Sequence, residues 1–359
     1  MKSTNPDSLL RNAVAQVTYG ETLDQQTMTE VVNLLMEVDL SSHPCELLAG
    51  SLLCSLKTRG ETVEEIVGAA LSLRSHQIHV PLADAGESLL DTCGTGGDGA
   101  HLINISTLTG LVAATLGVKV VKHGNRSVSS ACGSADLLEA MDYPLLNSSD
   151  DVAQCVRETG FGFLFAPHFH PALRNLASLR RSLGVRTLFN MLGPLVNPAG
   201  ATHQLIGVFS RDIVTPMARA AAKLGLQRCL VVHGEGGLDE LSPNGTSWVS
   251  LCQGETLEEM EWTPKLFGAS PVPLESLAGG TAVDNARISQ RLFAGEAPEL
   301  ARAVAMNCAA SLWLVGETDD FSEGYQRSYE ALQSGRVGAF FENARAFAAS
   351  MANRDAPNR

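Results

Sequence analysis

The sequence is short of cationic residues and contains no long uninterrupted hydrophobic run. Lysine and arginine number 26 against 39 aspartates and glutamates, which gives a formal net charge of −13. This balance disfavours nucleic acid as a partner, because nucleic-acid-binding surfaces carry a dense basic stripe. The most apolar stretch, residues 108–121, is interrupted by Lys119 and is shorter than the ~20 residues of a membrane span, so no membrane partner is expected.

The eight cysteines form no paired motif. They are scattered from position 45 to position 308, and none lies in a C-x-x-C arrangement. This spacing disfavours a zinc knuckle and a disulfide framework, and it favours reduced thiols in a cytoplasmic protein. The first residues also lack the continuous apolar segment of a secretory signal, so we expect a cytoplasmic location.

What the sequence does have is ample material for a core. Hydrophobic residues make up 45% of the chain and charged residues 18%, which is typical of globular proteins and excludes disorder for most of the chain. At about 150 residues per domain, 359 residues suggest about two domains. No internal repeat or low-complexity segment is present.

The pattern of apolar residues changes near residue 88. Residues 8–76 are predicted to be helical, because apolar residues recur there at helical spacing. Later, short apolar runs at 88–91, 118–121, 205–209 and 229–232 alternate with helical stretches at 106–116, 135–140 and 214–224. This alternation predicts an α/β sheet with crossover helices. Further helices are expected at 171–190, 299–314 and 323–334.

A glycine-rich turn follows the first of these predicted strands. Residues 90–99 read Leu-Asp-Thr-Cys-Gly-Thr-Gly-Gly-Asp-Gly, and a helix is expected to open at Asn-Ile-Ser-Thr, residues 104–107. Glycines let backbone N–H groups approach an anion, and a helix N-terminus adds free donors and partial positive charge. Alone, such a cluster is more often an ordinary tight turn. It matches neither a Walker A loop nor a G-x-G-x-x-G fingerprint.

A second cluster follows the next predicted strand. Residues 121–130 read Val-Lys-His-Gly-Asn-Arg-Ser-Val-Ser-Ser and combine two cations, an imidazole and several hydroxyls. Lys122 or Arg126 alone would usually be a solvated surface charge. Their clustering at a strand end, where α/β sheets bind ligands, favours a phosphate site.

Two further clusters carry possible chemistry. Asp239 and Glu240 are adjacent after a glycine turn; such pairs are usually surface residues, but they also suit Mg²⁺, which takes one or two carboxylates plus substrate oxygens. His168 and His170 suggest a metal pair, yet no third ligand is nearby, so packing or substrate contacts are favoured. Arg180 could pair with a substrate carboxylate through its planar guanidinium.

The motifs GTGGD, NIST, KHGNR, GSAD, RTLFNMLGPLVNPA and LDELSP occur here in this order. In this combination the sequence closely resembles the anthranilate phosphoribosyltransferase family, and the resemblance runs through nearly the whole chain, including residues 57–66 and 284–287. It implies an α/β fold of the nucleoside phosphorylase/phosphoribosyltransferase-like class, with a central mainly parallel sheet. It also implies a small helical domain, residues 1–78 plus a returning segment at about 171–195, beside a larger α/β domain, residues 79–170 and 196–350.

The resemblance further implies an activity in tryptophan biosynthesis. Phosphoribose is transferred from phosphoribosyl pyrophosphate (PRPP) to the amine of anthranilate, with Mg²⁺, in a cleft between the domains of a homodimer that forms through the helical domain. Lys122 and the helix N-terminus at Ser106 can stabilise the leaving pyrophosphate. The aromatic amine is already neutral, so a base is needed only after its attack, and His123 is the expected proton acceptor. His123 and Lys122 are therefore the expected catalytic residues.

The family pattern assigns the remaining site residues one by one. The residues that match PRPP-binding positions are Gly94, Thr95, Gly97, Asp98, Asn104, Ser106, Thr107, Lys122 and Ser134. The residues that match the anthranilate channel are Gly94, Asn125, His170, Arg180, Gly193 and Pro194. The residues that match magnesium ligands are Ser106, Asp239 and Glu240.

Several positions depart from the family pattern. Ala131 and Cys132 stand where a lysine and a serine are usual, Leu102-Ile103 replaces Thr-Phe, and Asp142 replaces a glycine. These changes leave two interpretations open: a weaker affinity for phosphate, or a paralogue that acts on another aromatic amine. A pyrimidine nucleoside phosphorylase shares the architecture, but the acid pair and the GPLVNP loop argue against it. A non-enzymatic nucleic-acid-binding relative is disfavoured by the acidic balance.

Overall fold

The computed structural model describes residues 6–38, 40, 43–82, 87–97, 99, 101–127 and 131–353. Within these ranges, no helix combines the length and the apolar character needed to cross a membrane. Of the residues singled out from the sequence, Asp98 and residues 128–130 of the second cluster lie outside the described part of the chain.

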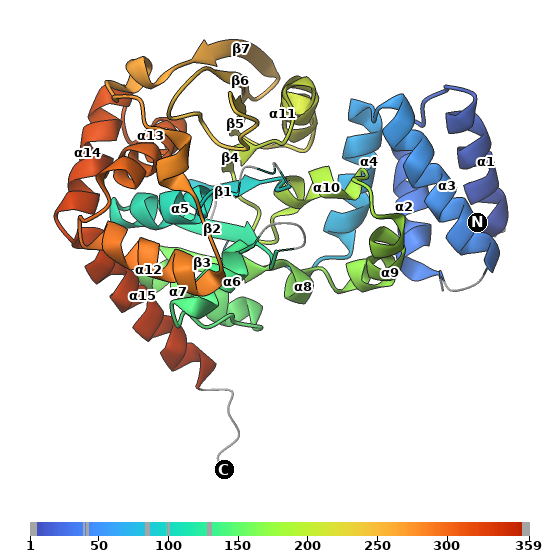
Figure 1. Cartoon of the computed structure of the whole chain (residues 1–359). Helices are drawn as coiled ribbons and strands as arrows, with labels where there is room; N and C mark the ends of the chain where they lie inside the picture. Colours follow the sequence, from blue (N-terminus) through green and yellow to red (C-terminus); the bar gives the residue numbers. More distant parts are fainter. Residues whose placement is uncertain are drawn as a thin grey trace.

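Helices form one end of the molecule (Figure 1). They are α1 (Pro6–Thr18), α2 (Gln25–Glu37), α3 (His43–Arg59) and α4 (Val63–Ser75), joined later in the chain by α9 (Arg174–Leu183) and α10 (Phe189–Leu192). α9 packs on α2 and α3, and α10 packs on α4. The returning segment therefore lies against the N-terminal helices. The helical stretch expected at 171–190 is interrupted: α9 ends at Leu183, because Gly184 has a φ of 62°, and α10 begins only at Phe189.

A buried carboxylate fixes the connections among the first helices. Glu65 forms a capping box with Thr62 at the start of α4 and an ion pair with Arg59 at the end of α3. Its second oxygen accepts a hydrogen bond of 2.9 Å from the N–H of Leu23, in the turn before α2. One fully buried side chain thus ties three helices together.

The remaining chain builds a seven-stranded sheet in its described part, with the order β3-β2-β1-β4-β5-β6-β7. The strands are β1 (Leu89–Gly94), β2 (Lys119–Gly124), β3 (Phe161–Phe165), β4 (His203–Gly207), β5 (Arg228–Gly234), β6 (Ser247–Gln253) and β7 (Thr256–Trp262). β1 to β5 are parallel, and β6 and β7 add an antiparallel edge. The mainly parallel α/β sheet expected from the sequence is confirmed. Strands β3, β6 and β7 were not among the strands predicted from the sequence.

Helices cover the sheet and complete the layers (Figure 1). They are α5 (Ile105–Thr115), α6 (Ser134–Ala140), α7 (Ser149–Thr159), α8 (Ala166–Phe169), α11 (Val214–Lys223), α12 (Ala282–Phe293), α13 (Pro298–Val315), α14 (Phe321–Gln333) and α15 (Arg336–Ala352). α5 packs on β1 and β2, α13 on β4 and β5, and α11 on β5 and β6.

Alternate residues of the central strands enter two different cores, as the two-residue period of a strand requires. Leu205 and Leu230 belong to a core built with α5, α7 and α13. Ile206 and Val231 belong to a second core that continues through α11 into α2, α3 and α4. The helical part is therefore packed on one face of the sheet through a shared hydrophobic core.

Candidate active site

The parallel strands β1, β2, β4 and β5 all end in glycine at the same edge of the sheet. A Cβ at Gly207 would lie 1.5 Å from the carbonyl oxygen of Asp239, and one at Gly94 would lie 2.5 Å from its Oδ2. A Cβ at Gly124 would lie 2.2 Å from Oγ of Ser134. The missing side chains therefore let the loop that carries Asp239 and the start of α6 approach the strand ends.

The acid pair lies directly on the anion-binding backbone. The N–H of Gly96 donates to Oδ2 of Asp239 at 3.0 Å, and the N–H of Ser106, in the first turn of α5, donates to Oε1 of Glu240 at 3.1 Å. The family resemblance assigns the glycine loop to PRPP and the start of α5 to its pyrophosphate. These backbone N–H groups therefore bind negatively charged oxygen, as expected of a glycine loop and a helix N-terminus.

The donor set at this point fits a magnesium ion. Asp239 and Glu240 supply carboxylate oxygens and Ser106 a hydroxyl, and Mg²⁺ prefers such oxygen ligands with water and phosphate completing its shell. Among the described residues, no group of three or more His, Cys, Asp or Glu side chains could hold a metal ion. Magnesium does not require such a group, because substrate phosphate supplies further ligands.

Lys122 lies beneath the N-terminus of α5. Its side chain is only 2% exposed, and Nζ donates to the carbonyl oxygen of Thr92 and, at 3.4 Å, to Oγ of Ser106. Oγ1 of Thr92 in turn donates to the carbonyl oxygen of Ser106 at 2.9 Å. The ammonium therefore stands at the junction of β1, β2 and α5, beside the candidate pyrophosphate site.

His123 and His170 form a neutral pair. Their ring centroids are 5.1 Å apart. Burial, reinforced by His170, lowers the pKa of His123 from 6.5 to about 3, and burial lowers the pKa of His170 to about 4. Nδ1 of His123 lies 3.1 Å from the carbonyl oxygen of Gly193, so Nδ1 carries the proton and Nε2 is an acceptor. That Nε2 is buried and has no hydrogen-bond partner among the described residues.

Three further residues assigned to the anthranilate channel, Arg180, Gly193 and Pro194, lie on the returning segment. A Cβ on Gly193 would meet no atom within 4 Å, so open space adjoins the carbonyl that holds His123. Pro194 follows it, and its carbonyl oxygen accepts from Nε2 of Gln204 at 2.7 Å. The guanidinium of Arg180 lies 5.8 Å from the ring of Phe189, and burial lowers its pKa. It makes no ion pair with any described residue.

Other assigned residues are held by protein contacts. The amide of Asn104 donates to the carbonyl of Cys132 and accepts from Asn285, both at 3.0 Å, and Oγ1 of Thr107 is buried. Oγ of Ser134 donates to the carbonyl oxygen of Asn125 at 3.3 Å. The side chain of Thr95 accepts a hydrogen bond of 3.1 Å from the N–H of Phe209. The binding roles assigned to these residues stay predictions.

A buried polar network below the two histidines was not predicted from the sequence. Asp91 accepts from the N–H of His123 at 3.2 Å, from Asn197 at 2.8 Å and from Gln204 at 3.4 Å. Burial raises the pKa of Asp91, and the nearby Lys122 opposes that shift. The network links β1, β2, β4 and the GPLVNP loop. The sequence signal that could have indicated this network is Asp91, a polar residue inside an apolar strand.

Two positions singled out from the sequence have local structural roles. His168 packs its ring edge-on against Phe165, with centroids 4.8 Å apart, while His170 faces His123, so the two histidines are not arranged as a pair around one ion. Asp142, where the family has glycine, has a φ of 60°, a left-handed conformation that aspartate tolerates.

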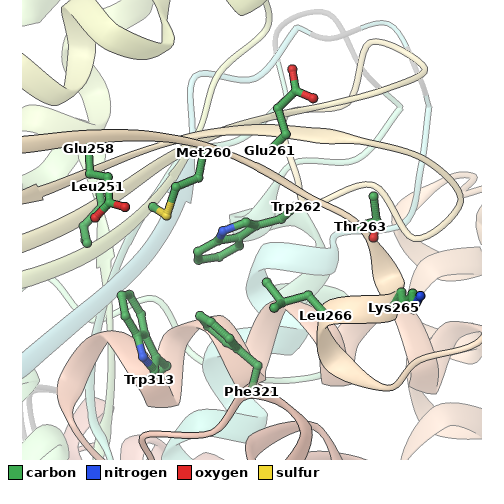
Figure 2. A pocket seen from close by; sticks show the side chains of 10 residues that line it. All are labelled: Leu251, Glu258, Met260, Glu261, Trp262, Thr263, Lys265, Leu266, Trp313 and Phe321. Atoms are coloured by element: carbon green, nitrogen blue, oxygen red, sulfur yellow. The ribbon is translucent and has the colours of Figure 1, made fainter.

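A wide pocket of about 950 Å³ lies elsewhere, between β7, α13 and α14. The rings of Trp262, Trp313 and Phe321 lie close together in it, and Glu258 and Glu261 of β7 are among its lining residues (Figure 2). None of the assigned site residues lines it.

Comparisons with known proteins agree with this geometry. Residues 86–337 match the a/b domain of a glycosyl transferase family, and residues 11–77 match the helical bundle domain of a glycosyl transferase family. The chain is 43% identical over 327 residues to the anthranilate phosphoribosyltransferase of Myxococcus xanthus, covering 91% of this chain and 95% of that protein. It is 39% identical to the enzyme of the same name from Persephonella marina, covering 94% of this chain and 99% of that protein.

Solved structures give the same result. The anthranilate phosphoribosyltransferase of Thermus thermophilus superposes with a TM-score of 0.85 at 43% identity, covering 94% of this chain and 99% of that one. The Saccharomyces cerevisiae enzyme, in complex with PRPP and Mg, superposes with a TM-score of 0.86 at 25% identity, covering 96% of this chain and 98% of that one. The chain therefore belongs to the anthranilate phosphoribosyltransferase family.

Proposed function

We propose that this chain transfers the phosphoribosyl group of PRPP to the amine of anthranilate, giving phosphoribosylanthranilate and pyrophosphate in tryptophan biosynthesis. The observation that carries this proposal is the placement of Lys122, the acid pair and the N–H groups of Gly96 and Ser106 around one strand edge, beside the neutral histidine pair. An anion site and a proton-acceptor site adjoin each other there. Family membership supports the same reaction.

The donor half of the reaction follows from charge. Pyrophosphate leaves with heavy negative charge, which Lys122 and the N-terminus of α5 stabilise as it develops. Asp239, Glu240 and Ser106 would hold magnesium, which when bound neutralises part of that charge. The carboxylates now accept hydrogen bonds from Gly96 and Ser106, so donor binding requires them to release these N–H groups.

The acceptor half depends on the histidine pair. After attack the amine nitrogen carries a proton that it loses readily, so Nε2 of His123 can accept it in spite of its low pKa. His123 keeps that lone pair free because Nδ1 is engaged by Gly193. Arg180, without an anionic partner among the described residues, is suited to the anthranilate carboxylate. The open space at Gly193 adjoins the carbonyl that engages His123.

Assembly and location complete the proposal. We assign residues 1–78 and about 171–195 to the helical domain and residues 79–170 and 196–350 to the α/β domain. The helical domain is proposed to form a homodimer, supported by the exposed apolar side chains of Tyr19 and Leu47, which are 87% and 59% exposed in the single chain. A cytoplasmic location is supported by the eight cysteines, all of which are free thiols.

The decisive test is the loss of anthranilate fluorescence when purified protein, PRPP and Mg²⁺ are mixed. A loss that EDTA prevents and that matches pyrophosphate release supports donor, acceptor and metal together. No loss from a folded protein that binds PRPP would overturn the acceptor assignment and direct the search to other aromatic amines. Failure to bind PRPP would overturn the whole proposal.

A further inference from the structure

Arg186 lies in the exposed connection between α9 and α10, on the segment that returns to the helical part. Its guanidinium carbon is 4.4 Å from the centroid of the Phe209 ring, and Nζ of Lys57, on α3, is 5.8 Å from the same centroid. Phe209 follows β4, and its N–H donates to Oγ1 of Thr95 in the glycine loop. The ring of Phe209, which belongs to the α/β part, therefore lies close to two cations from the helical part.

The same guanidinium contacts the glycine loop directly. A Cβ on Gly97 would lie 3.2 Å from Nη2 of Arg186 and 3.4 Å from Nε. Gly97 has a φ of 72°, so glycine is favoured here for its backbone as well as for this contact. The guanidinium therefore lies on the side of the loop toward which a side chain at position 97 would point.

Unlike Lys122 and Arg126, Arg186 donates to no protein oxygen of the described residues. Lys122 already donates to Thr92 and Ser106, and Arg126 pairs with Glu139. Arg186 makes no hydrogen bond or ion pair with any described residue. Stacking on Phe209 holds the guanidinium plane while leaving its N–H donors available.

We propose that Arg186, assisted by Lys57, binds phosphate oxygens of the donor from the helical side of the cleft. This rests on the proposed function, because it presumes a phosphorylated donor on the glycine loop. The donor brings several negative charges into a chain of net charge −13, and Ala131 supplies no cation where the family has one. A cation from the opposite side compensates that charge and makes donor binding bridge the two parts of the molecule.

The test compares Arg186→Gln with Arg181→Gln, which removes an exposed arginine from α9 on the same segment. Isothermal titration with PRPP and Mg²⁺ is expected to give a Kd about 10- to 100-fold higher for Arg186→Gln and unchanged for Arg181→Gln, as expected for loss of a hydrogen bond to a charged group. The KM for PRPP should rise in parallel, whereas the KM for anthranilate and the melting temperature stay the same. Arg186→Lys, which keeps the charge without the flat stack, should fall between.

Two further titrants identify the phosphate concerned. Weaker binding of magnesium pyrophosphate to Arg186→Gln assigns Arg186 to the pyrophosphate end, and weaker binding of ribose 5-phosphate assigns it to the 5′-phosphate end. An unchanged Kd for PRPP, or equal rises in both KM values, would overturn the proposal. If wild-type protein binds PRPP but leaves anthranilate unreacted, only the acceptor assignment fails, and the titrations still decide on Arg186. If wild-type protein does not bind PRPP, both proposals fail.

Discussion

His123 combines a buried ring, a fixed tautomer and an acceptor nitrogen without a partner among the described residues. General-base assistance is worth ~10²- to 10⁴-fold in rate. His123→Ala should therefore lower kcat by that range without abolishing turnover, because the anion site remains. Steady-state fluorescence assays with His79→Ala, an exposed histidine, as the control test this. A folded variant with activity below detection would contradict a purely assisting role.

Burial of the two histidines also links stability to pH. Their pKa values of about 3 and about 4 lie below 6.5, so between pH 6.5 and these values the unfolded chain binds more protons than the folded chain. The free energy of unfolding should therefore fall as pH falls below 6.5, by up to about 1.4 kcal/mol per pH unit for each histidine. Urea unfolding at pH 7.5 and pH 5.5 measures this. A His123→Asn/His170→Asn protein should show a shallower slope, and an equal slope would refute the assignment.

At the scale of the element, the glycine ends of β1 and β4 lie directly against the loop that carries Asp239 and Glu240. Asp239→Asn with Glu240→Gln keeps side-chain shape but removes both charges. We expect nearly complete loss of activity and loss of the magnesium dependence of PRPP binding, since the metal ligands are gone. Titration with PRPP at several Mg²⁺ concentrations measures the second effect. Normal rates in the double variant would rule out the metal assignment.

Two glycines of the site, Gly207 at the end of β4 and Gly193 on the returning segment, differ in what a methyl group would meet. Gly207→Ala would force a Cβ to 1.5 Å from the carbonyl of Asp239, so the loop must move, and overpacking of this kind costs about 1–3 kcal/mol. Gly193→Ala adds a methyl to open space at a φ of −46° and should leave stability unchanged. Its methyl should instead raise the KM for anthranilate. Thermal unfolding and kinetics of both variants test the contrast, and equal melting temperatures would contradict it.

For the whole molecule, the exposed apolar side chains of the helical part are the expected contact between two copies. Leu47→Glu places a charge in that contact and should convert the dimer to a monomer at micromolar concentration, because burying an unpaired charge is strongly unfavourable. Sedimentation velocity measures the change, with Val283→Glu, an exposed residue of α12, as the control. A wild-type monomer, or an unchanged dimer in Leu47→Glu, would refute the proposed interface.

Much of this architecture could be predicted from the sequence. The glycine loop, the KHGNR strand end and the helical start of the chain have local patterns, and the structure contains the corresponding elements. The polar network could not be predicted, because Asp91 meets Asn197 and Gln204 only after the sheet has formed. β3 is a five-residue apolar run that contains a glycine, too short to be told from a buried helical segment, and β7 is mostly polar. The contact of Arg186 with Gly97 likewise requires both parts to be packed together.

The returning segment and the sheet edge supply different parts of the site, so substitutions in each are expected to affect different substrates. Arg180 and Gly193 come from this segment, whereas the glycine loop, Lys122 and the acid pair come from the sheet edge. Substitutions in the segment at positions other than Arg186 can therefore alter which amine is accepted while the chemistry of the phosphorylated donor stays intact. A laboratory search for new acceptors should concentrate its libraries there, and a related enzyme could acquire a different substrate by the same route.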